Sequence, residues 1–134
     1  MVIMKKQIEV VAAIIKHNNK YLVVQRNNFG ELAKKWEFPG GKIEKGESNE
    51  EALIREIKEE LKTDIVIKNF FMTVNHEYKT FNLTLHAYLC EANTEEIYLT
   101  EHLNSKWLKK EDLKSVDWAE ADIPIVEKII KNDI

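Results

Sequence analysis

Four glutamates and one arginine stand at fixed spacing between residues 47 and 60. They are Glu47, Arg55, Glu56, Glu59 and Glu60. Carboxylate oxygens are ligands that Mg²⁺ and Mn²⁺ favour in proteins, and such ions offset the charge of a phosphate chain. The stretch therefore predicts a catalytic loop and helix that hold divalent metal ions against a phosphorylated substrate.

A helix has to position these side chains. Ser48 and Glu51 have the spacing of a capping box, so we expect the helix to begin near Asn49. Apolar residues at every fourth position then form one stripe that faces a core: Leu53, Ile57 and Leu61. The same geometry gathers three carboxylates on one flank of the stripe.

Glu56, Glu59 and Glu60 form that flank, and two interpretations compete for them. They could simply cover the solvated side of an amphipathic helix. However, a solvated face would alternate in sign, whereas like charges three and four positions apart repel each other. Arg55 is one cation against several acids, so bound Mg²⁺ or Mn²⁺ is the partner we expect.

The segment from Gly41 to Thr63 resembles the signature box of the Nudix hydrolases, in which a glycine, glutamates, an arginine and an apolar residue have fixed spacing. The matching residues are Gly41, Glu47, Arg55, Glu56, Ile57, Glu59 and Glu60. Lys62 stands where the family has glycine, and Thr63 stands where it has an apolar residue. Unless the helix ends differently, Lys62 has to adopt a left-handed turn at a cost of about 1 kcal/mol.

The resemblance extends over nearly the whole chain. It includes Val10–Ile15, Trp36–Gly41, Leu85–Tyr88, Glu101-His102 ahead of Trp107, and Ala121–Pro124. These segments are similar to the small MutT-type enzymes, most closely the branch that cleaves CTP and modified cytidine triphosphates. The resemblance implies an α/β/α sandwich with a mixed central sheet.

The same resemblance implies roles at the phosphate end of the site. Gly41 would add a backbone carbonyl to the metal ligands Glu56, Glu59 and Glu60. Glu47 and Arg55 would pair and lock the loop onto the helix. Either Glu56 or Glu101 would be the general base, and Glu101 is also a candidate metal ligand, although taken alone it could be an ordinary surface acid.

Four further positions match family residues that contact substrate. Arg26 would meet the triphosphate, although an arginine at a strand end is often simply solvated. Phe38 would stack on the base, and Glu37 and Asp122 would accept hydrogen bonds from an exocyclic amine. Asp122 could instead cap a helix that begins near Pro124, or do both. Guanine-specific relatives tend to carry asparagine there, which favours cytidine nucleotides.

Composition limits the other possibilities. With 134 residues and a net charge of −3, the chain is expected to form one domain, 1–134, whose partner is a metal-bound nucleotide rather than a nucleic acid polymer. Cys90 is the only cysteine, so it is expected to pack inside a strand in a reducing cytoplasm. No stretch has the length of a membrane span. The chain could be a monomer or a homodimer.

Hydrophobic alternation and turn residues predict the remaining elements of an α/β fold. Strands are expected at 7–15, 21–26, 65–74, 81–92 and 106–108, and a polar connection over 27–35 leads to 36–38. Pro39, Gly40 and Gly41 are expected to break the chain. A mobile stretch is expected over 93–104, a helical turn over 111–113, and a C-terminal helix over 124–130. His76, Tyr78 and His86 are expected to be packing or surface residues, with at most a lining role in a pocket.

The sequence thus predicts a Mg²⁺-dependent pyrophosphohydrolase that converts a nucleoside triphosphate to the monophosphate and pyrophosphate, for sanitation of the nucleotide pool. CTP, dCTP, modified pyrimidine triphosphates and 8-oxo-dGTP are the candidate substrates. A second possibility is hydrolysis of ADP-ribose or a dinucleotide polyphosphate. A third is a non-catalytic nucleotide sensor that keeps the same fold.

Overall fold

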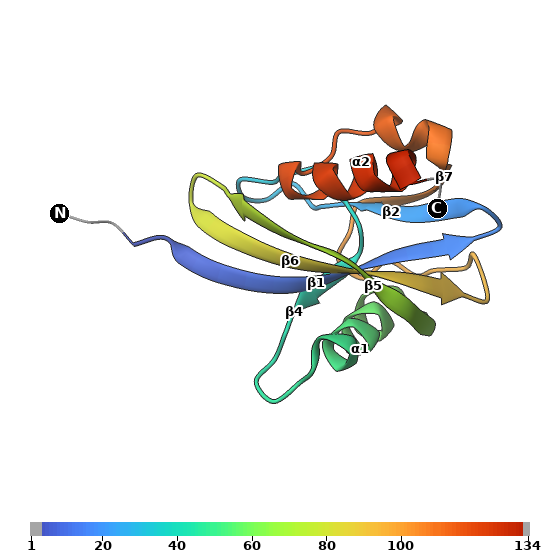
Figure 1. Cartoon of the computed structure of the whole chain (residues 1–134), viewed down its shortest axis with the longest axis horizontal. Helices are drawn as coiled ribbons and strands as arrows, with labels where there is room; N and C mark the ends of the chain where they lie inside the picture. The colour runs from blue at the N-terminus through green and yellow to red at the C-terminus, as the bar shows by residue number, and fades with distance from the viewer. Residues whose placement is uncertain (1–3, 133–134) are drawn as a thin grey trace.

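A mixed sheet with one helix on each face organises the computed structural model, which describes residues 4–132 (Figure 1). The strands are β1 Lys6–His17, β2 Lys20–Gln25, β3 Trp36–Glu37, β4 Gly40–Lys42, β5 Ile65–Glu77, β6 Phe81–Ala92 and β7 Asn104–Lys109. The helices are α1 Asn49–Leu61 and α2 Ile123–Asn132, with short 3₁₀ turns at Lys110–Ser115 and Glu120–Asp122. This arrangement confirms the predicted α/β/α sandwich.

The sheet follows the order β3-β2-β1-β6-β5, with β4 added to β1 and β7 added to β2. β1 and β6 are parallel, and the other pairs are antiparallel. β1 pairs with β2 only at their hairpin end, and further along it pairs with β4 through Val10, Val11 and Ala12. This change of partner places Gly40–Lys42 between the centre of the sheet and α1.

Strict alternation along β1 supplies both halves of the core. Val11 and Ile15 pack on the α1 side with Leu53, whereas Ala12 and Ile14 pack on the α2 side. Burial of each large aliphatic side chain stabilises the fold by roughly 1.5–3 kcal/mol. Because both faces of β1 are buried, the strand reads as a continuous apolar run and holds the two helices at a fixed separation.

Both ends of α1 agree with the sequence analysis. Ser48 accepts from the Glu51 N–H, and the Glu51 side chain accepts from the Ser48 N–H, so the predicted capping box is present. At the other end Lys62 adopts φ 54° and ψ 37°, which is the left-handed conformation that the family gives to glycine. The helix therefore ends as it would with glycine, and Lys62 carries the strain.

Two expectations about local structure need correction. Gly40 and Gly41 do not simply break the chain, because they pair with β1 as strand β4. The stretch 93–104, expected to be mobile, is fastened at several points: Thr100 donates to the Glu60 carbonyl at 3.0 Å and the Leu103 N–H donates to Gln25 at 2.9 Å. These bonds hold the stretch against α1 and β2.

The expected burial of the single cysteine is confirmed. Cys90 is 2% exposed within β6, and burial raises the pKa of its thiol to about 12, which suits a packing role. Within residues 4–132, no helix is long and apolar enough to cross a membrane.

Candidate active site

A cleft of about 620 Å³ runs between α1 and the loops at the edge of the sheet. It brings together the residues that the sequence predicted for both ends of a nucleotide, except Glu47 and Arg55. Those present are Arg26, Glu37, Phe38, Gly41, Glu56, Glu59, Glu60, Glu101 and Asp122. Residues from five separate parts of the chain therefore line one space.

Glycine at position 41 allows the Glu56 side chain of α1 to lie close against β4. A Cβ atom on residue 41 would overlap the Glu56 carboxylate. Its neighbour Gly40 is constrained more strictly, because a Cβ there would overlap the Val11 backbone carbonyl, which cannot move aside as the Glu56 side chain can. Glycine lets a backbone approach a functional group this closely, so β4 brings its peptide groups directly to the acidic flank of α1.

Glu47 and Arg55 form an ion pair that joins the loop to α1, as the family resemblance implied. We call this pair the brace. Arg55 Nε and Nη2 lie 2.7 and 2.8 Å from the two oxygens of Glu47, in bidentate geometry. Arg55 Nη2 also donates to the Lys42 carbonyl at 3.1 Å. Hydrogen bonds from Arg55 lower the pKa of Glu47 to about 2. The loop, β4 and α1 are therefore joined through one guanidinium that stands behind the cleft.

The remaining guanidinium nitrogen of Arg55, Nη1, is shared by two other carboxylates of α1. Arg55 Nη1 lies 2.9 Å from Glu56 Oε1 and 3.3 Å from Glu59 Oε2. Glu60 receives nothing from it, and its buried Oε2 has no hydrogen-bond partner among residues 4–132. Burial, a hydrogen bond to Glu56 and the charges of Glu56, Glu37 and Glu101 raise the pKa of Glu60 to about 9.

These features fit a hard divalent cation. In the described part of the chain, no three acidic, histidine or cysteine side chains already converge as a complete ligand set. Glu56 and Glu59 instead turn toward Arg55, which is the available positive charge. Three features supply the oxygen donors that Mg²⁺ prefers: a buried oxygen of Glu60 without a partner in the described part of the chain, the carboxylates of Glu56 and Glu59 on the same helix, and the close approach of Gly41. The candidate metal residues therefore lie together but are not preassembled.

The opposite end of the cleft is built around Glu37 on β3. Arg26 Nη1 lies 3.2 Å from one oxygen of Glu37, and His102 Nε2 lies 3.3 Å from the other. Arg26 was expected to meet the triphosphate, and in the structure it lines the cleft while its guanidinium pairs with Glu37. Glu37 is thus held from two sides with its carboxylate at the cleft.

Asp122 and Phe38 close this end. Asp122 is 3% exposed, and its Oδ1 accepts from the Phe38 N–H at 3.3 Å, so its carboxyl group joins the start of α2 to β3. Burial and the nearby charge of Glu37 raise the pKa of Asp122 well above its usual range. The Phe38 ring packs on Trp118 with centroids 4.8 Å apart and is only 3% exposed. It lines the cleft from within the core.

Several lining residues were not predicted. The sheet contributes an apolar wall, and loops add two more side chains: Ile8, Val10, Phe81, Leu83, Leu85, Leu32 and His102. The alternation along β6 could have identified Leu83 and Leu85 as one face. Tyr78 does line the cleft, and its hydroxyl accepts from the Ala121 N–H at 2.8 Å. His86 lies outside the cleft and pairs with Glu9.

Known proteins with similar sequences match nearly the full length of this chain. A model of the NUDIX domain matches residues 10–128. The CTP pyrophosphohydrolase of Escherichia coli is 36% identical over 122 residues, which cover 91% of this chain and 90% of that protein. The 8-oxo-dGTP diphosphatase of the same organism is 30% identical over 125 residues, covering 92% and 97%.

A solved structure gives the same result. The MutT protein of the Nudix hydrolase family from methicillin-resistant Staphylococcus aureus 252 superposes with a TM-score of 0.77 at 46% identity, covering 96% of this chain and 99% of that one. Fold, cleft and relatives together define an enzyme that hydrolyses the phosphoric anhydride bonds of nucleoside triphosphates. The chain belongs to the Nudix hydrolase family. Members of this family typically use a divalent metal ion.

Proposed function

We propose that this protein is a Mg²⁺-dependent pyrophosphohydrolase of the cytoplasm that converts CTP or a modified cytidine triphosphate to the monophosphate and pyrophosphate. One observation carries the proposal. A single cleft joins the crowded carboxylates of α1 to an acid-lined pocket at β3. A nucleotide has the matching order of parts, because its anionic phosphates and its base lie at opposite ends.

The phosphate end supplies the reaction. Bound Mg²⁺ would neutralise the phosphate oxygens and stabilise the negative charge that develops on the leaving nucleoside monophosphate. Glu56, Glu59 and Glu60, with the Gly41 carbonyl, are the residues that would hold it. Glu56 or Glu101 would take the proton from a water that attacks the β-phosphorus, as the family resemblance implies. Glu47 and Arg55 keep the loop and helix in register during this step.

The base end favours cytosine. Glu37 is held between Arg26 and His102 and offers acceptor oxygens. Burial and the charge of Glu37 raise the pKa of Asp122, which favours its protonated form, and a protonated carboxyl group can donate as well as accept. Cytosine has the complementary edge, with a donating 4-amino group beside an accepting ring nitrogen. Uracil would place a carbonyl oxygen against Glu37.

A second candidate substrate is 8-oxo-dGTP. The observation in its favour is the 30% identity to the 8-oxo-dGTP diphosphatase of Escherichia coli over nearly the full length of both chains. Guanine also has donors, at N1 and the 2-amino group, that Glu37 could bind. The larger base would need the apolar wall formed by Leu83 and Leu85 to accept its second ring.

A substrate panel in ¹⁸O-labelled water tests the proposal. CTP, UTP, GTP, 8-oxo-dGTP, ADP-ribose and a dinucleotide polyphosphate are each incubated with Mg²⁺. We expect CTP to give CMP and labelled pyrophosphate, because attack at the β-phosphorus places the new oxygen there. Release of orthophosphate, or label in CMP, would contradict the mechanism. Faster cleavage of ADP-ribose or the dinucleotide would assign the alternative activity, and binding without turnover would identify a sensor.

The Glu37→Gln variant tests the assignment of the base pocket. A glutamine can donate to the uracil carbonyl, whereas a carboxylate cannot. We expect the CTP-to-UTP ratio of kcat/KM to fall by about 10-fold, the size of one hydrogen bond to a charged group. Glu9→Gln, outside the cleft, is the control. An unchanged ratio in Glu37→Gln would place the base elsewhere.

A further inference from the structure

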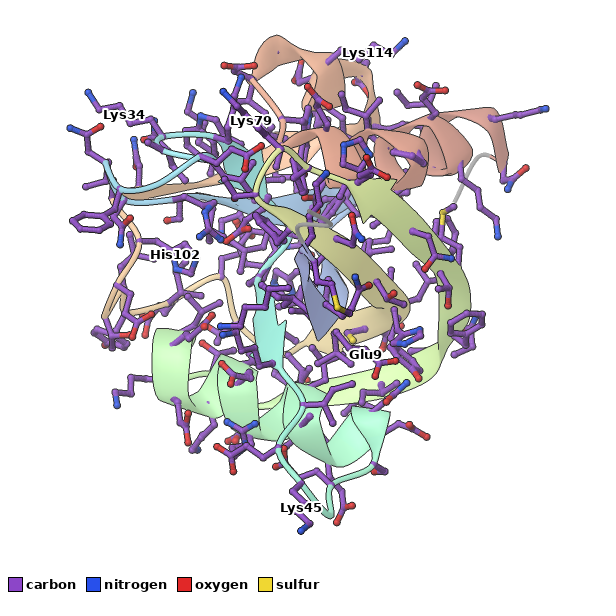
Figure 2. The ribbon with its side chains drawn as sticks, turned by 90° about the vertical axis from the view of Figure 1, so that its left-hand side faces the viewer. Glu9, Lys34, Lys45, Lys79, His102 and Lys114 are labelled. Carbon is purple, nitrogen blue, oxygen red and sulfur yellow. The ribbon has the colours of Figure 1, made fainter. Side chains whose placement is uncertain are left out.

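His102 is a cleft residue whose contacts the proposed function does not fully explain. Its side chain is only 8% exposed and lines the cleft. The backbone beside it is fixed, because the Leu103 N–H donates to the Gln25 carbonyl of β2 at 2.9 Å. Its Nε2 atom lies 3.3 Å from Glu37 Oε2. Figure 2 shows His102 above α1, far from Lys45 at the tip of the loop below that helix.

The second ring nitrogen, Nδ1, has no hydrogen-bond partner in the described part of the chain. A carboxylate only accepts hydrogen bonds, so the contact with Glu37 assigns the hydrogen to Nε2, and Nδ1 of the neutral ring is then an acceptor. Nδ1 is buried and has no hydrogen-bond partner among residues 4–132. A buried acceptor without a donor destabilises the fold. Support of Glu37 alone therefore does not account for this nitrogen.

The position of His102 along the cleft indicates which donor is missing. Glu37 belongs to the end that would bind the base, and Glu101, the neighbour of His102 in the chain, belongs to the end that would bind the phosphates. The sugar of a nucleotide connects these two parts. His102 contacts Glu37 at the base end and is next to Glu101 at the phosphate end, so it lies where the sugar of a bound nucleotide would be. The hydrogen-bond donors of a sugar are its hydroxyl groups.

We propose that His102 is the sugar-binding residue of this cleft. Nε2 holds Glu37, and Nδ1 accepts a hydrogen bond from a hydroxyl of the nucleotide's sugar. This inference rests on the proposed function, because it requires a nucleotide in the cleft. It predicts that the protein distinguishes nucleotides by their sugar hydroxyls as well as by their bases.

Two substitutions separate the two nitrogens. His102→Gln places an amide nitrogen near the position of Nε2 and has no group at Nδ1. His102→Asn places its amide near the position of Nδ1 and is too short to reach Glu37. The measurement is kcat/KM for CTP, 2′-deoxy-CTP and 2′,3′-dideoxy-CTP, with UTP as the test of base preference.

In the unmodified protein, removal of the contacting hydroxyl is expected to lower kcat/KM by about 10-fold. His102→Gln should reduce that difference to less than about twofold while the preference for CTP over UTP is kept. His102→Asn should keep the sugar difference and lose base preference. If His102 had only a structural role, both variants would instead have a kcat/KM that is lowered equally for all substrates. His17→Gln, at the far end of β1, is the control and should keep every ratio.

The outcomes separate the two proposals. Equal kcat/KM for the three sugars, or an undiminished sugar difference in His102→Gln, would overturn the role of His102 while leaving the hydrolase activity established. Failure to hydrolyse any nucleotide would overturn the proposed function. A measurement without turnover then still tests His102: its ¹⁵Nδ1 resonance should shift when CMP is added to metal-free protein and should not shift with 2′,3′-dideoxy-CMP. An unchanged resonance with CMP would overturn the inference.

Discussion

Glu47 and Glu60 belong to the same loop and helix, yet their surroundings differ completely. Glu47 receives two hydrogen bonds from Arg55 and one from the Glu44 N–H, and its pKa falls to about 2. Glu60 is buried beside other acids with one oxygen unpartnered among residues 4–132, and its pKa rises to about 9. One carboxylate is stabilised by the protein, and the other is destabilised by it.

The difference suggests separate roles for the two regions, one structural and one in cation binding. The Glu47 side is complete without any ligand, so it can fix the shape of the loop. The Glu60 side carries excess negative charge in a buried place, which is unfavourable unless a proton or a cation joins it. Folding of the first region thus holds the second region in a form suited to metal binding.

Removal of the unsatisfied carboxylate should have the largest effect. Glu60→Gln takes away a candidate metal ligand, and we expect kcat to fall by at least about 100-fold, since even residues that only orient ligands are worth 10–100-fold. The fold should persist, because an unfavourable buried acid is removed. Steady-state hydrolysis of CTP and a thermal melt measure both effects. Glu50→Gln, an exposed position on the same helix, is the control; equal activity in the two variants would contradict this assignment.

Disruption of the ion pair between Arg55 and Glu47 should have the next largest effect. Arg55→Lys keeps the positive charge but cannot form the bidentate contact with Glu47. We expect kcat/KM to fall by about 10–100-fold because the ligands lose their support. Lys58→Ala, on the same helix as Arg55, removes a surface ion pair with Asp64 beyond the end of that helix and should have little effect. If the two variants behaved alike, the brace would have no special role.

Stability should depend on pH in opposite directions for the two glutamates. The pKa of Glu47 is lowered from 4.5, so its contribution to stability is present above pH 4.5 and is lost as the pH falls toward 2. The pKa of Glu60 is raised from 4.5, so its contribution is present below pH 4.5 and is lost as the pH rises toward 9.

Urea unfolding of metal-free protein across this range measures the effect. Glu47→Gln should flatten the loss of stability on the acid side, and Glu60→Gln should flatten part of the loss on the alkaline side. Asp122, whose pKa is also raised, accounts for a further part of the alkaline loss. If stability depended on pH identically in the two variants, the opposite roles inferred for Glu47 and Glu60 would be contradicted.

The smallest effect is expected at the C-terminal end of α1, where backbone conformation rather than charge determines the outcome. Lys62 adopts a left-handed conformation at φ 54°. Lys62→Gly should stabilise the protein by about 1 kcal/mol, or roughly 2–5 °C in Tm, with unchanged kcat. Lys62→Ala, which keeps the Cβ strain, should give no such gain. A gain with alanine would show that the charge, not the backbone, is responsible.

Local signals account for the parts of this molecule that the sequence predicted well. Ser48 and Glu51 lie three positions apart, so the cap of α1 can be identified without knowledge of the fold. The contact between Glu47 and Arg55 likewise depends on one loop and one helix. Hydrophobic patterns along the strands predicted the α/β class, whereas the sandwich with two covered faces came from the family resemblance.

Long-range contacts account for what the sequence did not predict. Glu37 and His102 are 65 positions apart, and nothing near either residue indicates that they meet. β4 has only three residues, and its pairing is set by β1 rather than by its own composition. The stretch 93–104 has the polar composition of a mobile loop, whereas bonds to α1 and β2 hold it in place.

Binding of Mn²⁺ followed by electron paramagnetic resonance, with a non-hydrolysable cytidine triphosphate analogue present, tests the central claim most directly. The claim is that the acids of α1 bind divalent metal for the phosphates of a nucleotide. We expect Mn²⁺ to bind the unmodified protein and Glu50→Gln equally, and to bind Glu60→Gln at least about 10-fold more weakly. Equal affinity in Glu60→Gln, or no Mn²⁺ binding by the unmodified protein, would contradict the claim.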